Sequence, residues 1–497
     1  YCSVNHRYMK KRLSQKLFAL SFLITASLSS IAQDASYTNK NALPEIGVVA
    51  SDAISLDKEM IVGDAVMRQM RGQSPLIADP VLDEYLQDLG NRLVIHAENA
   101  KFPFRFFWVN NDAINAFAFF GGHIGVHTGL MRRANTESEL ASVLSHEISH
   151  VTQRHIARSM QAQQRSSPLA IASLIGGVLI AMANPQAGMA AMQAGQAASV
   201  QMQIDYTRSN EQEADRIGIA MLSRAGFDAN GAADFFSIMA EEYRNVSRPP
   251  ARLLTHPLTE SRIADARSRA DDYPSRFVPV SKQFELAKAR IMARYSFEPD
   301  YAVEHFTAQV DKKAYRVREA SLYALALAYM RTEEYDKAQE IIMGELLTKD
   351  SGNLFYLDAA TDIYIAKGEP LKAVEMLSPF VENSPRNQVL ALNQANAMIS
   401  ASRYDDAISL LKDFLLVNDE YQIAHQLMSE AYQKAKRFSQ MHQSKAEVYA
   451  LYGAYTRAVD ELQYAYNFAK DDDHLQKQRI RARIKQFRDQ EERLQRL

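Results

Sequence analysis

The sequence predicts a mainly α-helical protein, in which an α+β domain precedes a solenoid of helical repeats. Apolar residues recur at helical spacing over most of the chain, and a stretch rich in aromatic and β-branched residues, at 104–131, interrupts them. After about residue 280, a helical pattern with a central alanine returns every 34–36 residues. We therefore expect an α+β domain over residues 55–275 and a repeat domain over residues 280–497.

Length and composition are those of an ordinary globular protein. The 497 residues are enough for two or three domains, and 47% of them are apolar while 23% are charged. The formal net charge is −2. Because a nucleic-acid-binding protein normally carries a strong basic surplus or stripe, we expect no nucleic-acid partner.

The N-terminal residues contain the parts of a secretory signal in order. Residues 10–12, Lys-Lys-Arg, precede the apolar stretch LFALSFLITASL, and a small-residue run ends at Ala32. We expect residues 1–32 to be a cleaved signal, with Met9 as the natural start, and the mature protein to be exported. A short buried helix is the alternative. Residues 33–54 are polar and turn-rich, which predicts a mobile lead-in.

The single cysteine, Cys2, lies before the predicted cleavage site. The mature chain would therefore hold no disulfide, although exported proteins meet conditions that permit one. Thiol catalysis and a zinc site built on cysteine are excluded for the same reason.

The α+β domain is predicted to begin with two helices and a group of strands. Apolar residues at helical spacing indicate two helices between Lys58 and Asn99. In the stretch 104–131, aromatic residues are interrupted by Asn-Asp and Gly-Gly pairs, which is typical of short strands joined by turns. A capping-box pattern at Thr136 and Glu139 then opens a further helix. Its apolar stripe comprises Leu140, Val143, Leu144 and Ile148.

That helix carries an HExxH motif, made by His146, Glu147 and His150. At 100° per residue the two histidines differ by 40° after one turn, so both can bind one cation. Neutral imidazole suits zinc, and a catalytic zinc typically keeps three protein ligands and one open position. Glu147 is placed to take a proton from water bound there. His155 lies 180° from His146, so we expect it to point away and to be structural.

A third ligand is expected from a helix that begins near Ser209. Glu211 and Asp215 are four residues apart and share a face of that helix, whereas Glu213 lies on the other side. One carboxylate can bind zinc while the other orients a ligating histidine. The alternative is a solvated acidic helix start, which the helix dipole favours.

Residues 168–200 consist almost entirely of alanine, glycine, methionine and aliphatic residues. Their longest apolar run, 169–183, falls short of the roughly 20 residues that a membrane span needs. A packed helical hairpin is the first interpretation. The second is a flap over the site or a surface that touches membrane or unfolded substrate, because methionine-rich surfaces adapt to varied partners. A membrane span is the third.

The repeat domain has the period of tetratricopeptide repeats. The recurring alanines are Ala302, Ala338, Ala373 and Ala407. A helix-turn-helix unit of about 34 residues with a small residue at the helix crossing is typical of this repeat. Met441 matches the next position only weakly, and Ala458 comes half a period late. We therefore expect about four regular repeats and an altered or capping end, with a plain helical bundle as the alternative. Solenoids of this kind usually bind other proteins.

The HExxH motif and the Glu211-x-x-x-Asp215 pattern about 60 residues later resemble gluzincin metallopeptidases of the Ste24/HtpX/Oma1 type over residues 55–270. With the signal segment and the repeats, the chain resembles the periplasmic β-barrel assembly-enhancing proteases of Gram-negative bacteria over nearly its whole length. The resemblance implies one Zn²⁺ per chain, held by His146, His150 and Glu211. It also implies Glu147 as general base and Asp215 behind a metal ligand.

The same resemblance implies two further features of the site. Residues 115–131 would be the edge strand that pairs with an extended substrate, although Phe120 stands where family members often have proline. Similar peptidases have a Thr-His-Pro segment and a downstream arginine, which match His256 and Arg262. His256 could stabilise the oxyanion, or it could fill the open metal position as a regulatory latch and fourth ligand. We favour the latch, with a surface-loop histidine as the alternative.

The resemblance implies a periplasmic zinc endopeptidase that degrades misassembled or stalled outer-membrane β-barrel proteins and helps their assembly. Its partners would be such unfolded clients and, through the repeats, the β-barrel assembly machinery, with a peripheral membrane contact as a further expectation. The alternative is a chaperone or assembly factor whose peptidase is latched or secondary. A structural zinc protein without turnover is the third option.

Overall fold

The computed structural model describes residue 50 and residues 53–164, 197–244, 256–274 and 276–495. The predicted signal, nearly all of the lead-in and residues 168–196 of the apolar segment lie outside the described residues. All of the described residues belong to one compact unit of the chain. Among them, no helix combines the length and the apolar character that crossing a membrane requires.

Two helices open the α+β part, as predicted. α1 spans Leu56–Gln73 and α2 spans Pro80–Val94, with the short strand β1, Leu76–Ile77, between them. The Ser55 hydroxyl caps α1, and the Asp79 carboxylate caps α2 by accepting hydrogen bonds from two backbone N–H groups of the first turn. These caps satisfy donors that the start of a helix leaves without a helical partner.

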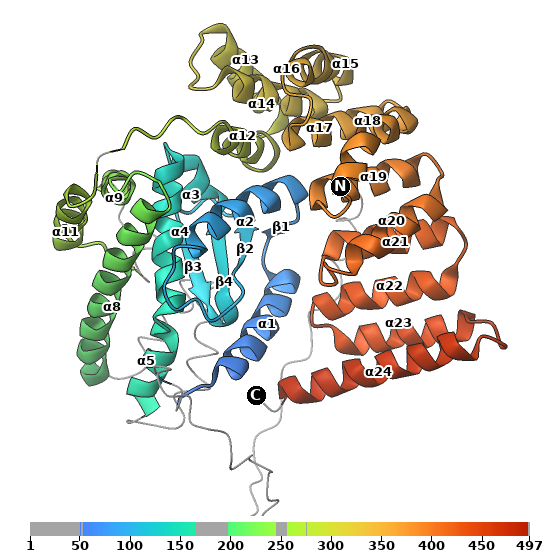
Figure 1. Cartoon of the computed structure of the whole chain (residues 1–497), viewed down its shortest axis with the longest axis horizontal. Helices are drawn as coiled ribbons and strands as arrows, with labels where there is room; N and C mark the ends of the chain where they lie inside the picture. The colour runs from blue at the N-terminus through green and yellow to red at the C-terminus, as the bar shows by residue number, and fades with distance from the viewer. Residues whose placement is uncertain (1–49, 51–52, 165–196, 245–255, 275, 496–497) are drawn as a thin grey trace, which may run out of the picture. The chain divides into compact units, whose positions relative to one another are not determined.

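Three further strands complete a four-stranded sheet in the order β1-β2-β4-β3 (Figure 1). β2 spans Arg105–Val109, β3 spans Ala116–Phe119 and β4 spans His123–His127. β4 runs parallel to β2 and antiparallel to β3, while β1 is antiparallel to β2. The prediction of short strands in residues 104–131 is therefore confirmed.

The prediction that residues 115–131 form one edge strand is wrong in part. Within this stretch only β3 lies at an edge of the sheet, because β4 returns between β3 and β2. The chain reverses through the 3-10 turn Phe120–Gly122, where Gly121 has φ +76°. Glycine adopts this left-handed conformation without the steric cost of a side chain. Within residues 115–131, the edge that an extended peptide could pair with is thus β3 alone.

The helix that carries the motif is α4, Glu137–Thr152, and it is buried along almost its whole length. Thr136 Oγ1 accepts a hydrogen bond from Glu139 N, as the capping-box pattern predicts. In return Glu139 Oε2 accepts one from Asn135 N, one residue before the cap. α4 follows the short helix α3, Thr128–Arg133.

Helix α8, Ala197–Arg224, packs along α4 and approaches its backbone closely at Gly218. A Cβ atom at Gly218 would lie 3.1 Å from the backbone nitrogen of His146, so a larger residue would force the helices apart. This approach sets the carboxylates of α8 beside the histidines of α4. α9, Gly231–Tyr243, packs on α4, and α11, Glu260–Asp271, packs on α8 and α9.

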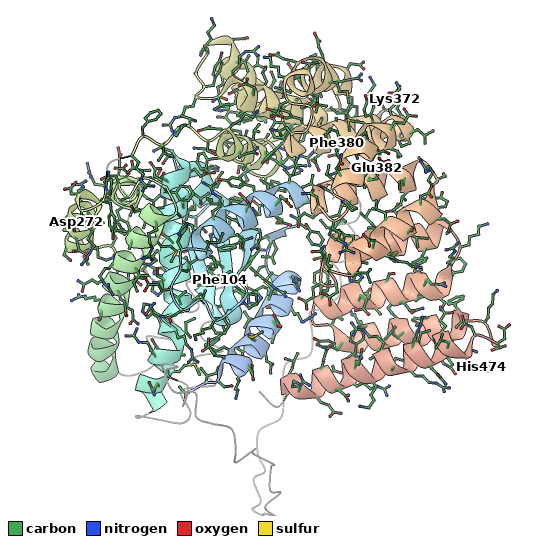
Figure 2. The ribbon with its side chains drawn as sticks, viewed as in Figure 1. Phe104, Asp272, Lys372, Phe380, Glu382 and His474 are labelled. Carbon is green, nitrogen blue, oxygen red and sulfur yellow. The ribbon has the colours of Figure 1, made fainter. Side chains whose placement is uncertain are left out.

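The repeat part consists of successive helix pairs. Their first helices are α12 Lys282–Ile291, α14 Arg318–Arg331, α17 Leu354–Ala366, α19 Gln388–Ser400, α21 Gln422–Lys434 and α23 Tyr455–Phe468. Their second helices are α13 Pro299–Asp311, α15 Tyr335–Gln339 with its extensions η3 Glu340–Leu346 and α16 Leu347–Lys349, α18 Pro370–Asn383, α20 Tyr404–Leu415, α22 Phe438–Leu451 and α24 His474–Gln495. The first helices begin 33–36 residues apart. On α18, Lys372 and Glu382 are exposed and Phe380 is half-buried (Figure 2).

The four predicted alanines are fully buried, and each lies in a second helix of its pair. The expectation of an altered end after four repeats is wrong, because α21–α22 and α23–α24 continue the helix pairs. Met441 lies in α22, the second helix of the fifth pair, so it holds the predicted register position. Ala458 lies in α23, a first helix, which explains why it comes half a period late.

The first repeats pack against α2 through a buried ionic network. Arg290 Nε lies 2.8 Å from Asp79 Oδ2, and Arg290 Nη1 lies 2.7 Å from Asp358 Oδ2. Arg294 adds a second guanidinium, 4.0 Å from the same Asp358 oxygen. The Tyr295 hydroxyl donates to Asp79 Oδ2 at 2.7 Å. We call this set the junction network, because it joins the cap of α2 to α12 and α17.

Later repeats contact α1 as well. Arg68 lies 2.6 Å from Glu420 Oε1 and donates to the backbone oxygen of Ala450 at 2.8 Å.

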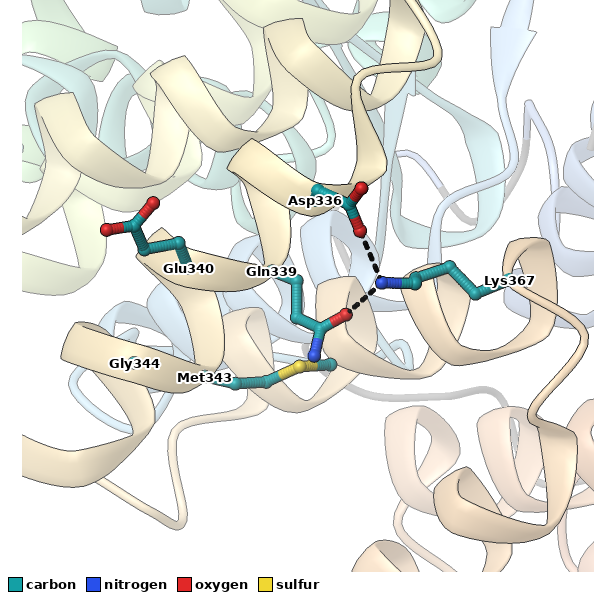
Figure 3. Close-up of a pocket in the computed structure, with 6 residues that line it drawn as sticks. All are labelled: Asp336, Gln339, Glu340, Met343, Gly344 and Lys367. Atoms are coloured by element: carbon teal, nitrogen blue, oxygen red, sulfur yellow. Dashed lines mark hydrogen bonds and ion pairs between the residues drawn. The ribbon is translucent and has the colours of Figure 1, made fainter.

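A hollow of about 420 Å³ lies elsewhere on the repeats, beside η3 (Figure 3). There Lys367 Nζ donates to Asp336 Oδ1 and Gln339 Oε1, both at 2.6 Å. These side chains are already paired with one another, so we read the hollow as structural.

Candidate metal centre

Four side chains from three parts of the chain converge beside α4. His146 and His150 come from α4, Glu211 comes from α8, and His256 comes from the segment before α11. One ligand atom from each lies within 4.8 Å of all the others. We call these four residues the metal cluster. Across the described ranges it is the one group of histidine and carboxylate side chains with such spacing.

The spacing and the ligand types fit a zinc ion. His146 Nε2 lies 3.0 Å from His150 Nε2 and 3.3 Å from His256 Nδ1. Glu211 Oε1 lies 3.2 Å from His150 Nε2 and 2.9 Å from His256 Nδ1. Ligands about 2.0–2.1 Å from a tetrahedral ion lie about 3.3 Å from one another. Imidazole nitrogens and a carboxylate oxygen are also ligands that zinc takes.

The two carboxylates of α8 occupy different places. Glu211 belongs to the metal cluster. Asp215 Oδ1 lies 2.9 Å from His146 Nδ1, the ring nitrogen that faces away from the metal cluster. Arg262 on α11 holds Asp215 through two contacts, of 2.7 and 2.8 Å. Although burial raises the pKa of Asp215, the hydrogen bonds from His146 and Arg262 outweigh it and lower this pKa to about 2. Asp215 is therefore a carboxylate at any ordinary pH.

The carboxylates also control the protonation of His146. Burial lowers its pKa, but the charges of Glu211 and Asp215 outweigh that effect and raise the pKa to about 9. Without a metal, His146 is protonated at neutral pH. A bound metal requires the neutral ring, so metal binding would release a proton.

Glu147 is buried beside His256 of the metal cluster. Its side chain is 1% exposed, and Oε1 lies 3.6 Å from His256 Nε2. His256 therefore faces the cluster with one ring nitrogen and Glu147 with the other. A carboxylate in this place can exchange a proton with a molecule held at the cluster.

The expectation that His155 points away from the site is wrong. His155 Nδ1 lies 2.8 Å from His150 Nδ1, and its Nε2 lies 3.1 Å from Glu213 Oε2. The angle of 180° assumed one continuous helix, but α4 ends before Arg154, which has φ +50°, and α5, His155–Gln164, starts anew. Burial and then the positive potential of His150 lower the pKa of His155 to about 3, so this ring is neutral.

All seven residues that the sequence predicted for the site lie in this one region. They are His146, Glu147, His150, Glu211, Asp215, His256 and Arg262. His155 also contacts the ligand His150, and Glu213 in turn contacts His155; the motif spacing gave no sign of this. The edge strand β3 packs beside α4, and no described strand pairs with its outer side.

Comparisons with known proteins agree with a peptidase site. The family model of peptidase family M48 matches residues 80–270, which include α4 and α8. A relative from Vibrio cholerae is 44% identical over 84% of this chain and 86% of its own. The beta-barrel assembly-enhancing protease of Escherichia coli is 41% identical over 98% of this chain and 99% of its own. The metalloprotease LoiP of E. coli is 22% identical over 50% of this chain and 96% of its own.

These relatives are named as proteases, so the alternative of a chaperone with a secondary peptidase is not favoured. Peptidases of family M48 depend on a metal, which agrees with the four convergent ligands. At 41–44% identity over most of its length, the chain belongs to the family of beta-barrel assembly-enhancing proteases, metal-dependent peptidases with an M48 domain.

Proposed function

We propose that the protein is a zinc-dependent endopeptidase of the periplasm, with one zinc ion held by His146, His150 and Glu211. The observation that carries this proposal is the convergence of four ligand atoms within 4.8 Å of one another, from the buried helix α4, from α8 and from the segment before α11. The predicted signal segment supports an exported protein.

Zinc held by these residues would supply Lewis acidity for the scissile carbonyl and would lower the pKa of the attacking water. Glu147 takes the proton from that water and delivers it to the leaving amine, because its carboxylate is buried beside the cluster. Asp215 fixes the His146 ring with Nε2 toward the metal, and Arg262 keeps Asp215 in place.

We propose His256 as a regulatory latch and fourth metal ligand. Four filled positions are typical of a closed zinc site, whereas catalysis needs one open position. The His256 Nδ1 atom lies 3.3 Å from His146 Nε2 and 2.9 Å from Glu211 Oε1, as two ligands of one metal ion would. This spacing supports a resting form in which His256 fills the fourth position. His256 would have to leave before a substrate carbonyl could enter. A role as oxyanion stabiliser predicts the opposite effect of removing it.

The substrates we propose are misassembled or stalled outer-membrane β-barrel proteins. The E. coli relative is named a beta-barrel assembly-enhancing protease, which supports this class. Such clients expose strand edges, and β3 offers an edge beside α4 with which an extended peptide could pair. The repeats would recruit clients and the assembly machinery, since solenoids commonly bind proteins.

The test is cleavage of an unfolded outer-membrane β-barrel protein by the zinc-loaded enzyme. We expect His256→Ala to cleave faster than wild type, because the latch is gone. Adding Glu147→Gln should reduce that rate by about 10²–10⁴-fold while zinc stays bound. Slower cleavage by His256→Ala would support the oxyanion role. Equal cleavage by the double variant would contradict Glu147 as the base.

A further inference from the structure

The structure assigns to His155 a role as a positioning residue for the metal ligand His150. This inference rests on the proposed metal site. The two rings meet through their Nδ1 atoms, 2.8 Å apart, and His155 is 3% exposed. On its other side, His155 Nε2 lies 3.1 Å from Glu213 Oε2.

The direction of the hydrogen bonds follows from the ligand role of His150. Its Nε2 faces the cluster, so in the metal-bound form its Nδ1 carries the proton and donates. His155 Nδ1 must then be the acceptor, and the proton of the neutral His155 ring must sit on Nε2. From there it is donated to the Glu213 carboxylate. Each nitrogen of the two rings thus has one defined partner.

Glu213 is itself fixed by a second contact. Arg158 Nη1 lies 2.7 Å from Glu213 Oε2, so an ion pair between α5 and α8 fixes the carboxylate that contacts His155. Both side chains are partly exposed, at 26% and 28%. The carboxylate therefore sits at the edge of the domain, while the ring that it orients is buried.

The backbone break before His155 makes the contact geometrically available. Arg154 has φ +50°, and its guanidinium lies 2.5 Å from Glu59 Oε1 on α1 and donates to the Ile54 oxygen at 2.6 Å. Both charged side chains are almost fully buried, at 4% and 5% exposure. This clamp holds α5 at an angle that returns His155 to the ligand side of α4.

The two ligand histidines of α4 are therefore oriented by acceptors of different charge. His146 Nδ1 faces the Asp215 carboxylate, whereas His150 Nδ1 faces a neutral imidazole. An acceptor of either kind fixes the tautomer and the plane of the ring. Loss of the acceptor would leave His150 free to rotate away from the metal position.

The experiment measures zinc dissociation constants by chelator competition and visible spectra of the cobalt-substituted protein. We expect His155→Leu to weaken zinc binding by about 10–100-fold and to alter the cobalt spectrum. His155→Gln should restore most of the affinity, because its carbonyl can accept from His150 and its amide can donate to Glu213. Wild-type affinity and spectrum in His155→Leu would overturn the inference.

Two controls separate positioning from general stability. His425→Leu removes another buried histidine with a hydrogen bond, that of His425 Nε2 to the Asp419 oxygen, and should lower Tm without changing zinc affinity. If His155→Leu does not fold, Glu213→Ala replaces it and should also weaken zinc binding, whereas unchanged affinity would overturn the inference. The wild type beside His150→Ala tests the metal site itself. If these two bind zinc equally, the proposed function fails and not merely this inference.

Discussion

Two buried clusters, the metal cluster and the junction network, both hold carboxylates, but only the metal cluster holds histidines. In the junction network, the carboxylates of Asp79 and Asp358 face the guanidiniums of Arg290 and Arg294, and Arg294 also pairs with Asp362 at 2.8 Å. Around the metal cluster, Arg262 pairs with the carboxylates of Glu211 and Asp215, and Glu147 lies beside His256. Nitrogens of three imidazoles, those of His146, His150 and His256, lie 2.9–3.3 Å from the Glu211 oxygens.

The difference teaches how to tell a structural network from a ligand site. Guanidiniums compensate buried carboxylates by themselves, whereas imidazole nitrogens that converge beside a carboxylate are the ligands that zinc takes. At the metal cluster, one ligand atom from each of the four residues lies within 4.8 Å of all the others. The junction network contains no histidine, and its arginines pair with its carboxylates directly. We therefore interpret it as a structural contact between α2 and the repeats.

The largest effect is expected from unbalancing the junction network. Arg290→Met leaves the Asp79 and Asp358 carboxylates buried without their main cation. We expect the free energy of unfolding to fall by about 3–5 kcal/mol. The midpoint of urea unfolding measures this. A midpoint within error of the wild type would show that the network does not hold the repeats to α2.

A smaller effect is expected from removing the charge of the carboxylate behind His146. Asp215→Asn keeps the shape of the side chain but removes the charge that faces His146 and Arg262. Zinc affinity should fall by about 10–100-fold, because the orientation of a ligand histidine is lost. Isothermal titration of the zinc-free protein measures the affinity. An affinity equal to that of the wild type would show that the Asp215 charge does not orient His146 for zinc binding.

The smallest effect concerns an uncompensated carboxyl beside the junction network. Tyr421 OH donates to Asp83 Oδ2 at 3.3 Å, but burial and then the charge of Asp79 raise the pKa of Asp83 well above its usual range. A raised carboxyl pKa means that stability falls as pH rises above about 4, through the folded-state pKa. At pH 7 Asp83→Asn should therefore stabilise the protein by about 1 kcal/mol.

This gain should disappear near pH 4, where Asp83 is protonated in the wild type. Tm measured from pH 4 to pH 8 gives the dependence. The control is Asp88→Asn, which removes an exposed carboxylate of the same helix and should change Tm little at either pH. A loss of stability at pH 7 in Asp83→Asn would reverse the assigned direction.

Local patterns predicted much of the fold and the site. The 100° step of a helix placed His146, Glu147 and His150, and the four-residue spacing placed Glu211 and Asp215 on one face. The same rule failed for His155, because neither glycine nor asparagine marks the left-handed residue Arg154. That conformation is held by Glu59, 95 residues away, and such a contact leaves no local signal.

Local sequence patterns could not predict the order of the strands or the junction network either. The position of β4 inside the sheet depends on its parallel pairing with β2 across a loop and a turn. Arg290 reads locally as a basic residue in the last turn of α12, where the helix dipole favours it. Only the packing of α12 against α2 makes it the centre of a buried network.

The zinc content of three purified proteins tests the central claim most directly. They are the wild type, Glu211→Ala at the metal cluster and Tyr295→Phe at the junction network. We predict one zinc per chain in the wild type and in Tyr295→Phe, and none retained by Glu211→Ala after dialysis. Zinc bound equally by all three would contradict the claim that the metal cluster holds the metal.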